Sequence, residues 1–159
     1  MIEQIKKQLE ILNQQEKELT AIYHSAAIKF GISDSEFWVW YSLLVLGGEY
    51  SQQNICDMWS LPKQTVNSVI TNLTKKGYVF LETVPGTRNR KIIRLTEEGK
   101  RFGENRVLHI YEAEQRAIEK MPEQELRTYI ALMGKYITLL REEINREQTI
   151  HDNRQKGEL

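Results

Sequence analysis

Residues 60–99 read SLPKQTVNSVITNLTKK and then GYVFLETVPGTRNRKIIRLTEEG, and this stretch decides the fold. Apolar residues recur in its first half at the three- and four-residue spacing of one helix face, namely Val66, Val69, Ile70 and Leu73. Pro62 suits the first turn of such a helix, where its missing N–H leaves no hydrogen bond unmade, and Gly77 suits the end. The other faces carry Gln, Thr, Asn and Ser. The stretch therefore begins with a helix that is apolar on one face and polar elsewhere.

The second half of the stretch predicts a β-hairpin with a basic tip. Residues 78–84 and 90–95 alternate in polarity or run β-branched, and the sequence PGTRN at 85–89 is typical of a turn. TEEG at 96–99 then starts a helix that continues to about Lys120.

Charge is distributed unevenly along the chain. The whole sequence has 22 basic and 22 acidic residues and no net charge. Between residues 60 and 96, Glu82 is the one acidic residue, whereas seven residues are basic: Lys63, Lys75, Lys76, Arg88, Arg90, Lys91 and Arg94. A positive excess confined to one short segment is expected where one face of a protein meets phosphates.

The segments before residue 51 predict two helices. Residues 2–30 keep an apolar spacing of three and four and indicate a long amphipathic helix that Gly31 ends. Ser33 and Glu36 have the spacing of a capping box, in which each side chain satisfies the other residue's free amide. The helix that follows, through residues 37–46, is apolar on nearly every face, so we expect it to be the buried centre of the domain.

The predicted fold class is mainly α, a winged helix-turn-helix. Ser51 is placed to cap a short third helix, Gln52–Trp59, and Pro122 opens a last helix near the C-terminus. A short helix, a tight turn, a polar-faced helix and a basic hairpin follow one another in the order of that fold. The fold has a small β-hairpin wing, flanked here by long N- and C-terminal helices.

The polar helix has the side chains that a DNA recognition helix needs. Short donors and acceptors near its N-terminus reach base edges in a major groove about 12 Å wide. The basic hairpin tip reaches the neighbouring minor groove or its phosphates. The predicted DNA-binding residues are Ser51, Gln52, Pro62, Lys63, Gln64, Thr65, Asn67, Ser68, Thr71, Asn72, Thr87, Arg88, Asn89 and Arg90.

From Ser51 to Gly99 the sequence closely resembles the MarR family, the multiple-antibiotic-resistance type of bacterial repressor. The combination of LPKQTVNSVI, a strand that starts at KKGYV and a helix that starts at LTEEG carries this resemblance, and the helical flanks extend it over about residues 1–147. The resemblance implies a homodimer with interlocked terminal helices, whose two winged helices bind adjacent major grooves of a pseudo-palindromic operator. Many members release DNA when a small aromatic or phenolic ligand, or an oxidant, acts on the junction between dimer helices and winged domains.

The wing departs from the family pattern, which usually has Asp-x-Arg shortly before the second strand. Counting back from Leu95 places Thr87 on the usual Asp and Asn89 on the usual Arg, while a slip of one residue makes Arg88 the match. The wing arginine is therefore Arg88 or Arg90, and no carboxylate stands ready to orient it.

We expect residues 33–97 to form the DNA-binding domain, residues 1–32 and 98–147 to form the helical dimerisation region, and residues 148–159 to be a flexible tail. The apolar stripes of the terminal helices exceed what one winged domain can cover. The residues assigned to dimer contacts are Ile5, Leu9, Leu12, Leu126, Ile130, Ile137, Leu140 and Ile144.

Aromatic residues near the junction suggest a pocket for an effector such as an aromatic acid. Its expected residues are Tyr23, His24, Trp38, Tyr41 and Tyr111. Core packing explains aromatic residues at helical spacing equally well.

Cys56 and the histidines have plainer interpretations. Cys56 is either an oxidant sensor or a small buried packing residue, and packing is favoured because a reactive thiol needs exposure and a cationic setting. His24, His109 and His151 have no Cys or His at metal-ligand spacing, so the sequence predicts neither a metal nor another cofactor.

Other classes of protein fit less well. The sequence has no Gly-rich phosphate loop and no nucleophile elbow, so we do not expect an enzyme. A winged helix that only binds proteins would need exposed apolar residues on helix 63–75. No signal-peptide core and no apolar run of roughly 20 residues is present, so we expect a cytoplasmic protein without a membrane partner. The expected partners are double-stranded DNA, a second copy of the chain and a small aromatic or phenolic effector.

Overall fold

The computed structural model describes residues 1–87 and 89–157, and the chain forms two compact units, Met1–Ala113 and Glu114–Leu159. The elements of the first unit are α1 (Ile2–Lys29), α2 (Asp34–Leu44), α3 (Gln52–Trp59), α4 (Lys63–Lys75), β1 (Val79–Thr83), β2 (Lys91–Leu95), α5 (Glu97–Gly103), η1 (Glu104–Leu108) and the start of α6 (His109–Glu119). The second unit contains the end of α6 and α7 (Glu123–Gly157).

The helix boundaries near the N-terminus follow the sequence closely. Gly31, at a φ of +72°, lies just beyond the end of α1, and the Ser33 hydroxyl caps α2 by accepting a hydrogen bond from the Glu36 amide at 3.2 Å. Only this half of the expected capping box forms, because the Glu36 carboxylate accepts a hydrogen bond from the indole of Trp40 instead. At the start of α3 the box is complete, with Ser51 and Asn54 bonding each other's backbone amides.

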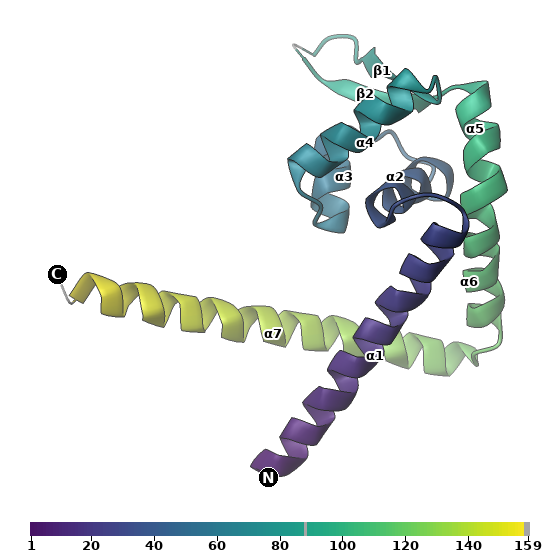
Figure 1. Cartoon of the computed structure of the whole chain (residues 1–159). Helices are drawn as coiled ribbons and strands as arrows, with labels where there is room; N and C mark the ends of the chain where they lie inside the picture. The colour runs from purple at the N-terminus through teal and green to yellow at the C-terminus, as the bar shows by residue number, and fades with distance from the viewer. Residues whose placement is uncertain (88, 158–159) are drawn as a thin grey trace. The chain divides into compact units, whose positions relative to one another are not determined.

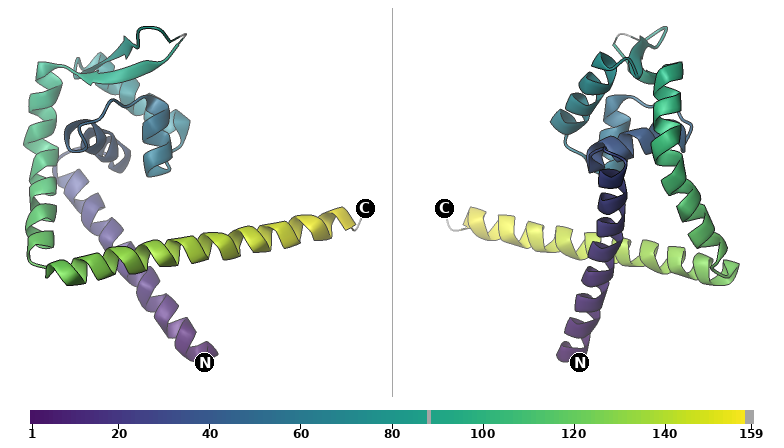
Figure 2. Two further views of the ribbon diagram at one scale, coloured as in Figure 1. Left: turned by 180° about the vertical axis from the view of Figure 1, so that it is seen from behind. Right: turned by 45° about the vertical axis from the view of Figure 1, so that its right-hand side comes forward.

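Helix α2 is the centre of the first unit, as predicted. It contacts α1, α3, α4, α5, η1 and β2, and both views of Figure 2 show it between α4 and α5. Phe37, Val39 and Trp40 of α2 are fully buried. The rest of the buried apolar core comes from the surrounding elements: Ala27, Ile32, Ile55, Cys56, Val66, Ile70, Leu73, Val79, Ile92, Ile93, Val107 and Ile110.

The wing is an antiparallel hairpin in which Val79 pairs with Leu95 and Thr83 with Lys91 (Figure 1). The Ile93 amide donates to the Tyr50 carbonyl at 2.8 Å, so the loop before α3 is tied to the outer edge of β2. Arg94 donates to Glu82 at 2.5 Å and to Glu49 at 2.6 Å. These bonds fix the base of the wing against the loop before α3.

The helical segment after the wing is not one α-helix. We predicted a single helix from residue 97 to about Lys120, whereas η1 is a π-helical insertion between α5 and α6. Such π-helical segments are rare and occur mostly as single turns within α-helices. Two buried glycines allow α5 to approach its neighbours: a Cβ at Gly99 would lie 1.9 Å from the Tyr78 carbonyl oxygen, and one at Gly103 would lie 2.4 Å from a methyl carbon of Leu44.

Helix α7 continues to Gly157, beyond residue 147 where the predicted dimerisation region ended. Residues 148–157, which we assigned to a tail, are therefore helical, and residues 158–159 lie outside the described part. None of the helices in the described part of the chain has the length and apolar content of a membrane span.

Candidate nucleic-acid interface

A tight turn between α3 and α4 sets the start of the candidate recognition helix. Ser60, directly after α3, has a left-handed backbone with a φ of 51° and a ψ of 37°. The amides of Ser60 and Leu61 both donate to the Cys56 carbonyl, which closes the end of α3. Pro62 then precedes α4, so α3, turn and α4 form a helix-turn-helix.

Helix α4 separates its apolar and polar residues as the sequence predicted. Val66, Ile70 and Leu73 are buried, and Thr65 and Val69 are half-buried. The other predicted DNA-binding residues of this helix and its cap are exposed: Pro62, Lys63, Gln64, Asn67, Ser68, Thr71 and Asn72. The exposed face therefore carries side chains that both donate and accept hydrogen bonds.

Two serines at the start of α2, its cap Ser33 and Ser35, extend this surface and were missed in the sequence. A hollow of about 430 Å³ beside α4 is lined by Ser33 and Ser35 together with Pro62, Gln64, Thr65, Ser68, Val69 and Asn72. Ser33 was recognised only as a helix cap, because its place beside α4 depends on how α2 and α4 pack.

A second hollow, of about 300 Å³, joins the start of α3 to the wing. It is lined by Ser51, Gln52 and Gln53 from one side and by Leu81, Asn89, Arg90 and Lys91 from the other. Ser51, Gln52, Asn89 and Arg90, which lie up to 39 positions apart in the sequence, are thus brought together. Two cations beside the first turn of a helix suit a phosphate.

Two of the predicted DNA-binding residues, Ser51 and Thr87, form hydrogen bonds within the protein through their hydroxyls. The Ser51 hydroxyl donates to the Asn54 side-chain oxygen at 2.8 Å and accepts from the Asn54 amide at 3.2 Å. The Thr87 hydroxyl donates to the Val84 carbonyl at 2.8 Å and thereby closes the turn at Pro85 and Gly86. A hydroxyl whose proton is already donated has only lone pairs left, which a phosphate oxygen repels. Arg88, the alternative wing arginine, lies outside the described residues.

The cations of the segment are not equivalent. The hydrogen bonds that Arg94 donates to Glu82 and, second, to Glu49 raise the pKa of its guanidinium above the ordinary value. The charge of Arg94 is therefore paired with two carboxylates of the protein. The other described cations of the segment are exposed: Lys63, Lys75, Lys76, Arg90 and Lys91. These five side chains are the described cations that remain to attract a polyanion.

The structure is similar to solved structures of MarR family regulators. A MarR family regulator from Neisseria meningitidis matches with a TM-score of 0.77 at 21% sequence identity, over 88% of this chain and 98% of that chain. A MarR/EmrR family transcriptional regulator from Acinetobacter sp. ADP1 matches with a TM-score of 0.65 at 25% identity, over 89% and 96%. The MepR–DNA complex of Staphylococcus aureus matches with a TM-score of 0.64 at 21% identity, over 82% and 94%. No protein-family model and no curated protein matches the sequence.

The chain has the fold of the MarR family. This result confirms the winged helix-turn-helix predicted from residues 60–99 and the resemblance drawn from them. Most of the DNA contacts that we predicted from the sequence belong to α4 and the hairpin of this fold.

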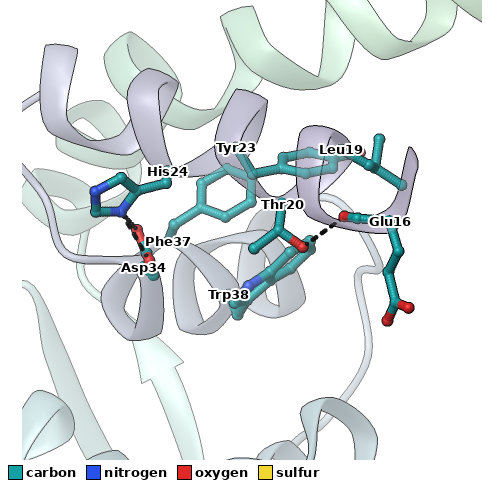
Figure 3. Close-up of a pocket in the computed structure, with 8 residues that line it drawn as sticks. All are labelled: Glu16, Leu19, Thr20, Tyr23, His24, Asp34, Phe37 and Trp38. Atoms are coloured by element: carbon teal, nitrogen blue, oxygen red, sulfur yellow. Dashed lines mark hydrogen bonds and ion pairs between the residues drawn. The ribbon is translucent and has the colours of Figure 1, made fainter. Parts of the chain in front are cut away.

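The MarR fold of this chain contains a pocket of about 460 Å³ between α1 and α2. Tyr23, His24 and Trp38, three of the five expected effector residues, line it, whereas Tyr41 and Tyr111 do not. Figure 3 shows the pocket with its further lining residues, which the sequence prediction missed: Glu16, Leu19, Thr20, Asp34 and Phe37. Thr20, Leu19 and Glu16 lie on the same face of α1 as Tyr23, because they precede it at steps of three and four residues. Helical spacing could therefore have predicted these three lining residues.

Trp38 links this pocket to the helix-turn-helix. Its ring stacks on Trp59, the last residue of α3, with centroids 4.2 Å apart and planes at 25°. The Trp59 indole donates to the Ser42 hydroxyl at 2.7 Å, and Ser42, which is fully buried, donates in turn to the Trp38 carbonyl at 2.9 Å. A wall of the pocket therefore touches the residue directly before the turn that leads into α4.

Cys56 is part of the core, and His24 and His109 lie beside acidic side chains. Cys56 is buried in α3, which supports the packing interpretation because a sensor thiol needs access to solvent. His24 Nδ1 lies 2.9 Å from Asp34, and His109 Nδ1 lies 3.6 Å from Glu112. In the described residues, no three His, Cys, Asp or Glu side chains are grouped as metal ligands.

The residues assigned to dimer contacts are mostly exposed in the single chain. Leu126 is half-buried, and the others, Ile5, Leu9, Leu12, Ile130, Ile137, Leu140 and Ile144, expose between 41% and 61% of their surface. Further exposed apolar residues lie on α7: Tyr129, Leu132, Met133, Tyr136, Leu139 and Ile150. The single chain thus leaves a long apolar stripe of α7 exposed, and large exposed apolar patches mark interaction sites.

Proposed function

We propose that the protein is a sequence-specific regulator of transcription, a repressor that binds double-stranded DNA as a homodimer on a pseudo-palindromic operator. One observation carries the proposal: in a MarR fold, α4 exposes a face of short hydrogen-bonding side chains beside a hollow that contains Arg90 and Lys91. The MepR structure to which the chain is similar is a complex with DNA. The chain acts where the genome lies, in the cytoplasm.

The roles of the residues follow from their chemistry. Gln64 and Asn67 present amides, which form paired hydrogen bonds with the edge of adenine in the major groove. Lys63, Arg90 and Lys91 supply charge to phosphates, which positions the helix without selecting a sequence. The protein has no catalytic role in this proposal, since binding alone blocks transcription.

The same proposal divides the chain into a DNA-binding domain, residues 33–97, and a dimerisation region, residues 1–32 and 98–147. The exposed apolar residues of α1 and α7 support the second assignment. Two copies place two α4 helices at a spacing near one DNA turn, roughly 34 Å, as adjacent major grooves require. A small molecule in the α1–α2 pocket relieves repression by favouring another spacing of the two helices.

The alternatives are less well supported. A winged helix that binds only proteins would expose apolar residues on α4, whereas those residues are buried or half-buried. An oxidant sensor would expose Cys56, which is buried.

The experiment that tests the proposal is selection of binding sites from a random DNA library, followed by mobility-shift titration. We expect an enriched inverted repeat, bound at least 10³-fold more tightly than random DNA at physiological salt. Enrichment of no sequence, with equal binding to all duplexes, would contradict sequence-specific regulation.

A further inference from the structure

The charges that line the α1–α2 pocket define the class of molecule that it holds. This inference rests on the proposed function, since it names the effector of the site already proposed. It concerns the eight residues shown in Figure 3.

The middle of the pocket is aromatic. Tyr23, Phe37 and Trp38 line it and contact one another, with ring centroids 5.8 Å apart for Tyr23 and Phe37, 5.3 Å for Tyr23 and Trp38, and 4.8 Å for Phe37 and Trp38. Leu19 adds an aliphatic side chain. A volume of about 460 Å³ lies within the range of small-molecule sites and accommodates a ligand of two or three fused rings.

The two sides of the pocket are acidic. Figure 3 shows Glu16 at one side of the aromatic rings and the His24–Asp34 pair at the other. Asp34 is engaged by His24 Nδ1 at 2.9 Å, whereas the described residues offer no salt bridge to the Glu16 carboxylate. Lysine and arginine are absent from the described lining, whereas two carboxylates, those of Glu16 and Asp34, belong to it.

We propose that the pocket binds an aromatic cation. The ring of Tyr23 and the face of Trp38 that is not stacked on Trp59 attract a positive charge, because the face of an aromatic ring is negative, and Glu16 supplies a full negative charge beside them. The sequence had led us to expect an aromatic acid. Such a ligand would add a negative charge to a site that already holds two carboxylates and no lysine or arginine, so the charge of the lining opposes it.

The two carboxylates have different roles in this proposal. Glu16 contacts the cation directly, because its carboxylate forms no salt bridge with another described residue that the ligand would have to displace. Asp34 keeps His24 in place and closes the pocket at the junction of α1 and α2, so it acts as a positioning residue.

Three ligands that share one three-ring frame test the sign of the charge. N-methylacridinium is a cation, acridine is uncharged at pH 8, and acridine-9-carboxylate is an anion. We expect isothermal titration calorimetry with the full-length protein at pH 8 to rank their affinities in that order, with about tenfold between cation and neutral ring, equivalent to about 1.4 kcal/mol. Tightest binding of the carboxylate, or no binding of the cation at millimolar concentration, would overturn the proposal.

Glu16→Gln removes the proposed contact and keeps the shape of the side chain. We expect it to weaken N-methylacridinium binding about fivefold and to leave acridine binding unchanged. Glu18→Gln is the matched control, because Glu18 is exposed on α1 but does not line the pocket. Equal effects of the two changes would refute the role of Glu16, and circular dichroism melts check that both variants fold.

These measurements contain no DNA. Failure of the cation to bind would therefore leave the DNA-binding proposal standing, and failure to select an operator would leave the pocket chemistry standing.

Discussion

Gln64 and Arg90 are both exposed at the candidate interface, yet they offer different chemistry to DNA. A neutral amide distinguishes bases, whereas a guanidinium on the wing attracts phosphates of any sequence. We predict that Gln64→Ala costs about 1–3 kcal/mol of binding free energy on the selected site and little on random DNA. Arg90→Ala is expected to weaken binding to both and to lower the log–log salt slope by roughly one unit per protomer.

Mobility-shift titrations at three salt concentrations check both changes. Lys100→Ala is a suitable control, since this exposed cation lies on α5 outside both hollows. If Arg90→Ala altered the preferred sequence and Gln64→Ala did not, the assigned roles would be reversed.

Ser42 illustrates how one buried hydroxyl supports the recognition helix from a distance. It accepts a hydrogen bond from the Trp59 indole and donates one to the Trp38 carbonyl. We predict that Ser42→Ala lowers the free energy of unfolding by about 1–3 kcal/mol, because the indole N–H loses its acceptor in a partly buried site. Urea denaturation measures the change. Ser68→Ala, on the exposed face of α4, is expected to stay within about 0.5 kcal/mol of the parent protein; equal stability of the two variants would argue against the role of Ser42.

At the scale of elements, the wing depends on the loop before α3, which lies about 30 residues earlier in the sequence. Arg94 holds both Glu82 of β1 and Glu49 of the loop, and the neighbouring Tyr50 carbonyl accepts from the Ile93 amide. We predict that Arg94→Lys speeds hydrogen exchange of the Ile93 amide, since one ammonium group cannot hold two carboxylates in the fork of a guanidinium. Arg101→Lys, exposed on α5, is the control. Unchanged protection of Ile93 in Arg94→Lys would show that Arg94 does not hold the loop.

Most elements of the fold were predictable because glycine, proline and capping residues punctuate the sequence. Gly31, Ser51, Pro62 and Gly77 act through local backbone geometry, so the limits of α1, α3 and α4 could be inferred without knowledge of the tertiary fold. The π-helical segment η1 could not, because it depends on the close packing of α5 and its surroundings against α2.

The candidate sites show the same division. The polar face of α4 follows from helical periodicity alone, whereas Ser33 and Ser35 join it only through the packing of α2. Tyr41 was expected in the effector pocket, but its ring packs with Trp38, Trp59 and Tyr111 instead. Trp38 lines the pocket and is stacked on Trp59 at the end of α3, so tryptophan fluorescence would not report on the pocket and the interface separately.

At the scale of the whole molecule, the apolar residues of α7 require a partner surface. We predict a stable dimer of twice 18.7 kDa in light scattering at micromolar concentration. Leu140→Glu combined with Ile144→Glu is expected to abolish the dimer, because burying unpaired charges costs several kcal/mol. Lys135→Glu is a charge control, because Lys135 lies on roughly the opposite side of the helix axis from Ile144. A monomeric parent protein would exclude the arrangement.

Gly99 restricts which amino-acid replacements the chain can accept during evolution. Its missing side chain leaves room for a backbone carbonyl, that of Tyr78, which cannot rotate away as a side chain would. In a saturation mutagenesis screen for folded protein, we expect position 99 to accept glycine alone, while the exposed neighbours Glu97, Glu98 and Lys100 accept most residues. Gly103 faces the end of the Leu44 side chain, which can move, so we expect position 103 to accept alanine with a loss of stability. Descendants of this chain would then keep a fixed glycine inside a variable charged segment, and free replacement of Gly99 in the screen would contradict the close approach of α5 to the Tyr78 carbonyl.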